Sequence, residues 1–169
     1  MQYVPKIDKD SAVKRLKQKE NFFQRKKNIC QSELIYVPYY LFSVNIHMEN
    51  NKTVDFYVCV DTIIGECAYL KERKEIKSTA SALSAQSSID AEMADERVRK
   101  FITNEILLKK KKLMNHKRMD ISLETVFEYP YWIGYFRRDD GIDFSAIDGV
   151  TGQKQGPKMK TMFIKYLLQ

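Results

Sequence analysis

Apolar residues recur at helical spacing in two charged stretches, and they alternate with polar residues over shorter intervals in the stretches that follow. Residues 8–28 contain no Gly or Pro, and Val13 and Leu16 lie there among Lys and Arg. Residues 88–116 carry a second run, in which apolar positions between Ala94 and Leu108 return every three or four residues. We therefore predict two amphipathic helices.

Side chains that cap helices precede both runs. Asp8 or Asp10 is placed to cap the first helix, and Ser88 or Asp90 is placed to start the second. The small and polar residues 78–88 form either a linker or a first helical turn.

A β-rich block follows each predicted helix. Three strands are predicted in the first block: 33–48, 54–63 and a short strand after a turn at Gly65. The second block contains two strands around a hairpin turn and then a closing strand or helix: 122–138, 142–150 and 161–169. This order of elements is typical of an α+β protein.

The two blocks repeat one pattern of residues. Pro-Tyr-Tyr-Leu at 38–41 matches Pro-Tyr-Trp-Ile at 130–133, and Asp-x-x-x-Gly occurs at 61–65 and again at 148–152. The two blocks differ in length at the hairpin turn, where a length change is tolerated. We therefore predict an internal duplication, in which each half is a helix packed on a curved antiparallel sheet. The predicted halves are residues 1–77 and 89–169, joined by 78–88.

Residues 144–153, FSAIDGVTGQ, resemble the strand–turn signature of the PepSY-like group of cystatin-type domains, in which a strand ends in Asp and a turn with Thr-Gly follows. Residues 57–67, YVCVDTIIGEC, are similar, with Ile64 in place of the Thr. The resemblance implies a helix on a curved antiparallel sheet in each half, and no catalytic residues. Members of that group are usually exported or membrane-tethered, and some are thought to restrain proteases, whereas no export signal is recognised at the start of this sequence.

Basic charge is concentrated in two segments. Residues 1–30 carry nine Lys or Arg against three Asp or Glu, and residues 97–118 carry nine against one, within a net charge of +7. The second segment contains a candidate surface for an anionic partner: Lys109, Lys110, Lys111, Lys112, Lys117 and Arg118. A solvated helix end is the alternative, because consecutive lysines on a helix point in different directions. If a twofold axis relates the halves, the two basic helices could lie side by side and form one positive face.

Aromatic residues gather in one strand of each block. A candidate aromatic interface consists of Tyr39, Tyr40, Tyr131, Trp132 and Tyr135. One interpretation places these residues in a core between the halves or between subunits, and the other in a groove for a peptide or single-stranded nucleic acid. Pro38 and Pro130 cannot donate a ladder hydrogen bond, so we expect a strand start, a bulge or an edge there, and with an edge the pairing of another chain.

Residues that could support catalysis or metal binding are few. Cys30, Cys59 and Cys67 form no CxxC pair, and the sequence contains no phosphate-binding loop, zinc-protease motif or nucleotide fingerprint. One arrangement stays open, a pocket that unites His47 with Cys59 or Asp61. The sequence therefore favours a protein that is not an enzyme and that needs neither a metal nor a cofactor.

The sequence also bears on location and partners. Its longest uncharged apolar-rich run, 34–46, is too short and too polar to span a bilayer, and the N-terminus shows no signal peptide. We expect a cytoplasmic location. We predict a non-enzymatic binding or scaffolding protein that acts through contacts with a protein partner or with its own copies. The alternative prediction is a nucleic-acid-binding protein that uses the two basic helices.

Overall fold

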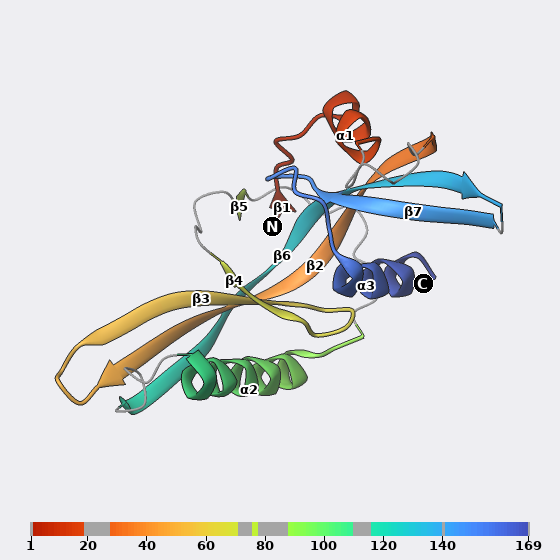
Figure 1. Ribbon diagram of the computed structural model, residues 1–169. Helices are drawn as coiled ribbons and strands as arrows, with labels where there is room; N and C mark the ends of the chain where they lie inside the picture. Colours follow the sequence, from red (N-terminus) through yellow and green to blue (C-terminus); the bar gives the residue numbers. More distant parts are fainter. Residues whose placement is uncertain are drawn as a thin grey trace.

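The computed structural model describes residues 2–18, 28–70, 76–77, 88–109, 116–139 and 141–168. These residues form three helices and a seven-stranded sheet (Figure 1). The strands are β1 (Gln2–Tyr3), β2 (Ile29–Met48), β3 (Thr53–Asp61), β4 (Cys67–Leu70), β5 (Ile76–Lys77), β6 (His116–Arg138) and β7 (Gly141–Asp148). The helices are α1 (Lys9–Leu16), α2 (Ala91–Lys109) and α3 (Pro157–Leu167). The predicted α+β class is confirmed.

Two long antiparallel strands, β2 and β6, form the centre of the sheet. They pair from Ile29 opposite Phe136 to Met48 opposite His116, and they appear as the diagonal ribbon of Figure 1. At one end β3 lies beside β2, with β4 beyond it, and at the other end β7 lies beside β6. The short β1 pairs with β6 in the parallel sense at Glu128, which makes the sheet mixed. The two β-rich blocks therefore share a single sheet.

The prolines of the repeated pattern lie inside these two long strands. The carbonyl of Pro38 accepts the N–H of Thr62 at 3.0 Å, and the carbonyl of Pro130 accepts the N–H of Gly149 at 2.9 Å. The N–H and C=O of one residue in an antiparallel strand point to the same side. The missing N–H of each proline would therefore point away from the β2–β6 ladder, toward the place where the β3 or β7 ladder ends. The central pair of strands consequently loses no hydrogen bond.

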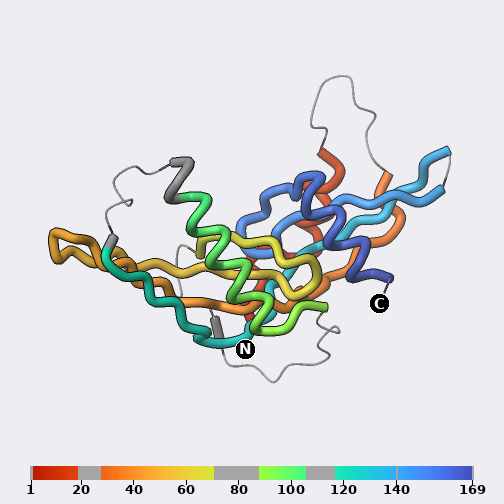
Figure 2. The backbone as a smooth tube through the Cα atoms, turned by 90° about the horizontal axis from the view of Figure 1, so that it is seen from below, coloured from red at the N-terminus to blue at the C-terminus, as the bar shows by residue number. Residues whose placement is uncertain are grey.

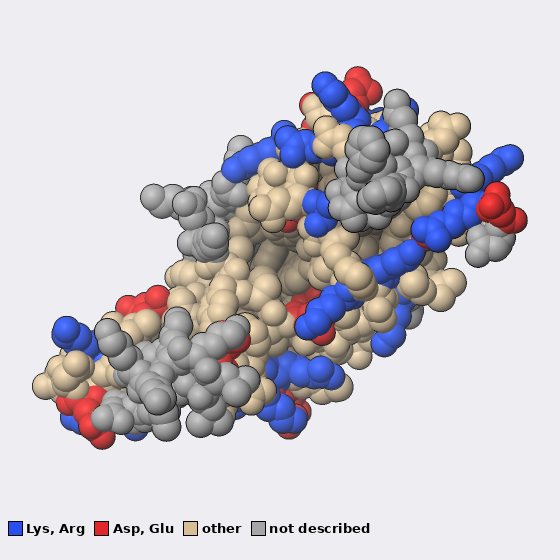
Figure 3. Space-filling model, in the orientation of Figure 1, with Lys and Arg blue, Asp and Glu red and all other residues tan. Residues whose placement is uncertain are grey.

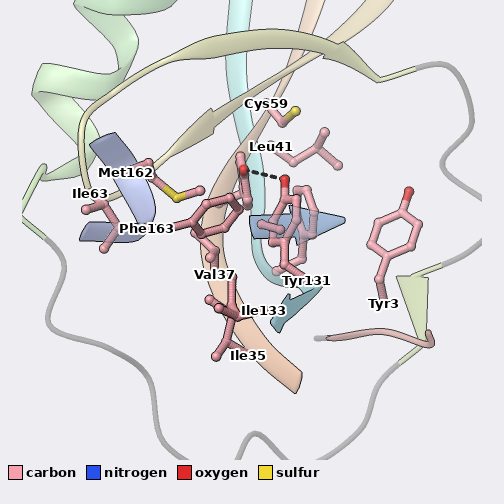
Figure 4. Packing of buried hydrophobic residues seen from close by; sticks show 13 residues of the cluster. Tyr3, Ile35, Val37, Leu41, Cys59, Ile63, Tyr131, Ile133, Met162 and Phe163 are labelled. Atoms are coloured by element: carbon pink, nitrogen blue, oxygen red, sulfur yellow. Dashed lines mark hydrogen bonds between the residues drawn. The ribbon is translucent and has the colours of Figure 1, made fainter. Parts of the chain in front are cut away.

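The two faces of the sheet carry different helices, because successive side chains of a strand point to opposite faces. Leu41 lies in the cluster that Met162 and Phe163 of α3 cover (Figure 4). The next residue, Phe42, lies in the cluster that α2 covers. Burial of one such apolar side chain stabilises the fold by roughly 1.5–3 kcal/mol. The alternating pattern of β2 thus supplies two cores at once.

Each of the first two helices packs on strands of the other predicted half. Ala12 and Leu16 of α1 are fully buried in a cluster with Trp132 of β6 and Ile147 of β7. Val98 of α2 is fully buried in a cluster with residues of β2 and β3. The expectation that each half packs its own helix on its own sheet is therefore corrected. An apolar helix face is complementary to any apolar sheet face of suitable shape, so it does not specify which one it covers.

The two basic helices lie far apart. In Figures 1 and 2, α1 and α2 cover opposite ends of the long ribbon. The expectation that they lie side by side and form one positive face is therefore wrong. Both are capped as the sequence predicts, since Asp8 accepts the N–H of Ser11 at 2.9 Å and Asp90 accepts the N–H of Met93 at 2.8 Å.

The bounds of three elements differ from the predicted ones. The helix predicted over 8–28 is seen as α1, and residues 19–27 lie outside the described part of the chain. The predicted closing element, 161–169, is a helix that begins earlier, at Pro157, where proline suits the first helical turn. The helix predicted as far as residue 116 is followed instead by β6, which begins at His116. No helix among the described residues is long and apolar enough to cross a membrane.

Candidate interaction surfaces

The centre of the aromatic strands is a pair of tyrosines that face one another. The hydroxyl groups of Tyr39 and Tyr131 lie 2.9 Å apart in a hydrogen bond, which is the dashed line of Figure 4. Both side chains are buried, and burial raises the pKa of both phenols above its ordinary value. Tyr39 lies opposite Asp61 of β3, and Tyr131 lies opposite Asp148 of β7. The two repeated motifs thus meet at this hydrogen bond.

Other rings extend this contact across the same face of the sheet. The ring of Tyr131 lies 5.0 Å from that of Phe163 in α3, and the ring of Tyr129 lies 5.0 Å from that of Tyr3 in β1. Such separations are favourable for tilted and edge-to-face aromatic pairs. These aromatics form a core that joins β1, β2, β6 and α3.

Trp132 and Tyr40 make equivalent contacts on the opposite face. The indole N–H of Trp132 donates to the carbonyl of Ile7 at 2.8 Å, and the hydroxyl of Tyr40 donates to the carbonyl of Ile89 at 3.2 Å. Ile7 lies two residues before α1, and Ile89 lies two residues before α2. Each side chain therefore fixes the approach to a helix. Tyr39, Tyr131 and Trp132 are less than one-tenth exposed, so these three do not line an open stacking groove.

Tyr135, the fifth aromatic candidate, lies farther along β6 and is half-buried. Its hydroxyl donates to the carboxylate of Glu33 in β2. Burial and this carboxylate raise the pKa of the Tyr135 phenol above its ordinary value. Tyr135 thus also contacts the other β-rich block.

The two Asp-x-x-x-Gly motifs form turns of the same design. Asp61 accepts the N–H groups of Ile63, Ile64 and Glu66 at 2.7–3.0 Å. Asp148 accepts the N–H groups of Val150 and Thr151, both at 2.8 Å. Gly65 and Gly152 have φ values of +76° and +71°, a conformation that favours glycine. Burial raises the pKa of Asp61 despite the hydrogen bonds from the backbone, which lower it. These carboxylates have a structural role.

The lysine-rich segment falls largely outside the described residues. Lys110, Lys111 and Lys112 are not described, and Lys109 is the last residue of α2. Lys117 and Arg118 are exposed at the start of β6, where Arg118 pairs with Asp120 at 2.7 Å. An exposed pair of this kind adds less than about 1 kcal/mol. On the face drawn in Figure 3, Lys and Arg gather mainly over the end that carries α1, β7 and α3.

The arrangement of His47 with Cys59 or Asp61 does not occur. His47 lies opposite Thr53, whereas Cys59 lies opposite Leu41 and therefore about 20 Å farther along the hairpin. The ring of His47 contacts Asp120 and Thr53 instead, at 3.2 and 3.3 Å. Within the described residues, no three His, Cys, Asp or Glu side chains could hold a metal ion together.

One of the three thiols is expected to react quickly with a disulfide reagent in the folded protein at pH 8. Burial raises the pKa of Cys59 to about 12 and that of Cys67 to about 11. At that pH the thiolate fractions of these groups are therefore only ~10⁻⁴ and ~10⁻³. Cys30 is exposed. Titration with Ellman's reagent should show one fast thiol in the native protein and three after denaturation. A fast phase that persists after Cys30→Ser would contradict this assignment.

Along residues 117–126 of β6, no other described strand pairs on the side away from β2. We call this stretch the β6 edge. Among the described strands, β1 pairs with β6 only at Glu128 and β7 pairs with it only from Tyr131 onward. Leu123 and Val126 are 46% and 45% exposed along this edge. The sequence predicts a strand start, a bulge or an edge at Pro38 and Pro130, whereas both prolines lie inside paired strands, because the partners of a strand are not encoded in its own residues.

The corresponding stretch of β2, residues 29–37, is different. It also extends beyond β3, but none of its large apolar side chains is exposed. Of these two stretches, the β6 edge alone presents exposed aliphatic side chains.

Comparison with protein-family models, with curated proteins and with solved structures found no match. The resemblance of residues 144–153 to PepSY-like domains therefore stays a prediction. The site has to be interpreted from its own geometry.

Proposed function

We propose that this protein is a non-catalytic binding protein that acts through protein contacts, and that the β6 edge is its binding surface. The observation that carries the proposal is a strand edge with which no other described strand pairs and which has two exposed aliphatic side chains, Leu123 and Val126. Unpaired N–H and C=O groups on such an edge accept a further strand, and alternate side chains give specificity. The occupant is therefore an extended polypeptide segment.

The other candidate surfaces support this choice indirectly. The aromatic candidates of β2 and β6 have partners inside the fold, as with Tyr39 and Tyr131, so their apolar surface is already used. The thiols of Cys59 and Cys67 are held in their protonated forms at neutral pH. A contact surface therefore agrees better with the described residues than a catalytic centre does.

Photo-crosslinking of the full chain in its own cells tests this function. A benzophenone amino acid at Leu123 is expected to give one discrete protein adduct, mapped by mass spectrometry. Met93 of α2 is the matched control, because its side chain is equally exposed, at 46%, but belongs to a helix and not to the β6 edge. Val126→Lys should lower the yield of the Leu123 adduct about tenfold, since a charge on an edge opposes pairing. No adduct, an adduct to nucleic acid alone, or equal adducts from both positions would overturn the proposal.

We also propose that the chain arose by internal duplication. In this proposal α1 and α2 are equivalent helices, and each packs on the strands of the other half. The support is a set of equivalent hydrogen bonds. Thr62 accepts at its carbonyl the N–H groups of Ser88 and Ile89, and Gly149 accepts those of Lys6 and Ile7. The Tyr40 and Trp132 contacts match in the same way.

A local twofold axis through the cross-strand pair Val37–Tyr129 would relate these contacts. Tyr39 follows Val37 by two residues in β2, and Tyr131 follows Tyr129 by two residues in β6. The axis would therefore relate the two tyrosines to each other, in agreement with their mutual hydrogen bond. Amide exchange measured by NMR should show similar protection at the N–H of Thr62 and of Gly149. Strong protection at only one of these two positions would contradict the proposal.

A further inference from the structure

We propose that the outer face of α3 binds to the surface of an anionic lipid bilayer. This face is separate from the β6 edge. Helix α3 covers the side of the sheet to which Leu41 points, whereas Leu123 of the edge is paired with Phe42, whose side chain points to the opposite side. The two surfaces therefore lie on different sides of the sheet.

Aliphatic side chains form a line along the outer face of α3. Met162 and Phe163 of this helix are fully buried against the sheet. Ile164 and Leu168, by contrast, are 43% and 81% exposed, and residues four apart lie on one line along a helix. Thr161, which precedes Ile164 by three residues, is also exposed. The helix therefore has one apolar side toward the sheet and a second, exposed line of aliphatic side chains.

Lysines lie on both sides of this line. Lys158 and Lys165 are seven residues apart, which is about two helical turns, so they share one flank. Lys160 lies on the other flank, where its ammonium group pairs with Asp143 of β7. The sequence of α3 contains no Asp or Glu. The exposed aliphatic line is therefore bordered by positive charge.

The stability of the helix does not explain two of these lysines. Lys158 and Lys160 lie among its first four residues, where the helix dipole is positive and cations are unfavourable. Gly156, at the N-cap, provides no side-chain hydrogen bond. Asp143 pairs with Arg138 as well, so this one carboxylate does not neutralise Lys160. The positive charge of α3 therefore remains available to a partner, at the end where Lys and Arg gather in Figure 3.

Lysines around an aliphatic line are typical of a helix at a lipid–water interface. There the aliphatic side chains enter the boundary of head groups and acyl chains, and the lysines extend to anionic head groups on their apolar stems. Interfaces between proteins are instead depleted in Lys and enriched in aromatic residues. Nucleic acids are bound through their phosphates and base edges, and Ile164 and Leu168 can donate no hydrogen bond to phosphate. The net charge of +7 also favours an anionic surface.

Helix α2 provides an internal comparison. Its residue Met93 is 46% exposed, so it also presents an apolar side chain to solvent. Acidic and basic residues are equally numerous in α2, however, and Glu92 lies next to Met93. Of the two helices, only α3 combines exposed aliphatic side chains with charge of a single sign.

Sedimentation of the full chain with lipid vesicles tests this inference. We expect binding to phosphatidylcholine vesicles that contain about one-third phosphatidylserine, since each Lys near an anionic surface strengthens binding about fivefold. Binding to phosphatidylcholine alone, and binding of Lys158→Glu with Lys165→Glu to the anionic vesicles, should each be at least ~10-fold weaker. The matched control is Lys52→Glu with Lys100→Glu, which changes the net charge equally at two exposed lysines outside α3. No binding to the anionic vesicles, or equal losses from the two double variants, would overturn the inference.

Ile164→Ser distinguishes a bilayer from other anionic partners. Removal of this aliphatic side chain should weaken binding to the anionic vesicles about fivefold, whereas Met93→Ser should leave it unchanged. Circular dichroism checks that both variants keep the fold, as expected for exposed positions. Equal binding by Ile164→Ser and the natural protein would overturn the inference. Retention on duplex DNA without binding to vesicles would overturn it in favour of a nucleic acid.

An environment-sensitive dye provides a second measurement. A nitrobenzoxadiazole group on Ile164→Cys, in a Cys30→Ser background, should brighten when anionic vesicles are added, because it enters a less polar medium. The same dye on Met93→Cys should not respond, and equal responses would contradict the placement of α3. A protein that forms the Leu123 adduct but binds no vesicles would overturn this inference and uphold the proposed function.

Discussion

Replacing Trp132 by Ala is expected to lower the free energy of unfolding by about 3–5 kcal/mol. Trp132 of β6 packs directly against α1, because its ring lies in a cluster with Ala12, Leu16 and Ile147 and its N–H donates to the carbonyl of Ile7. The substitution leaves a cavity beneath α1 and an unpaired carbonyl before it. Urea unfolding followed by circular dichroism measures the loss, since Trp132 is the only tryptophan and its fluorescence disappears with it.

Two further variants separate the contributions to this loss. Trp132→Phe keeps an aromatic ring but removes the N–H donor, so it should cost about 1–3 kcal/mol through the carbonyl of Ile7. Ile142→Ala in β7 is the control for an exposed position, because Ile142 is 72% exposed and its loss should stay below about 0.5 kcal/mol. A loss below 1 kcal/mol for Trp132→Ala would show that α1 does not depend on the strands of the second block.

Replacing Asp61 by Ala should destabilise the protein by about 3 kcal/mol, because three backbone N–H groups lose their acceptor in a buried turn. The groups are those of Ile63, Ile64 and Glu66. Asp61→Asn keeps an oxygen in place and should cost distinctly less. Chemical denaturation at neutral pH measures both variants, and an equal loss for the two would contradict this explanation.

The difference in stability between the natural protein and Asp61→Asn should depend on pH, and the direction of that dependence follows from the pKa of Asp61. Burial raises the folded-state pKa of Asp61 above its ordinary value of 3.8. A raised carboxyl pKa contributes stability that is complete below the unfolded-state pKa and is lost as the pH rises through the folded-state pKa. The stability of the natural protein minus that of Asp61→Asn should therefore decrease as the pH rises from about 3.8. An increase over that range would mean that the backbone hydrogen bonds outweigh burial.

Local features of this fold can be recognised in the sequence because neighbouring residues produce them. The alternation from Leu34 to Ile46 predicts a strand, and the spacing from Ala94 onward predicts a helix. Asp61 and Asp148 stand where carboxylates bind the N–H groups of the next few residues, and Gly65 and Gly152 follow where φ is positive. The aromatic strands also follow from composition, because aromatic residues favour half-buried strand positions.

The candidate site could be foreseen only in part. The aromatic candidates are recognisable by residue type, but their actual partners, such as the Tyr39–Tyr131 hydrogen bond and the Trp132 contact with Ile7, join residues more than 90 positions apart. Nothing in the sequence indicates the β6 edge. Pro38 and Pro130 predict a strand start, a bulge or an edge at their own positions, whereas their missing N–H groups face positions next to the ends of the outer ladders.

By itself, therefore, the sequence determined the class of the fold, the approximate position of its long strands and helices, and the chemistry of its two aspartate turns. The tertiary structure alone decided that β2 pairs with β6 and that α1 and α2 each cover strands of the other β-rich block. It also decided that no other described strand pairs with residues 117–126 on the side away from β2. The physical reason is that periodicity specifies which side of an element is apolar, but not which element covers it. That choice depends on the packing of the whole chain.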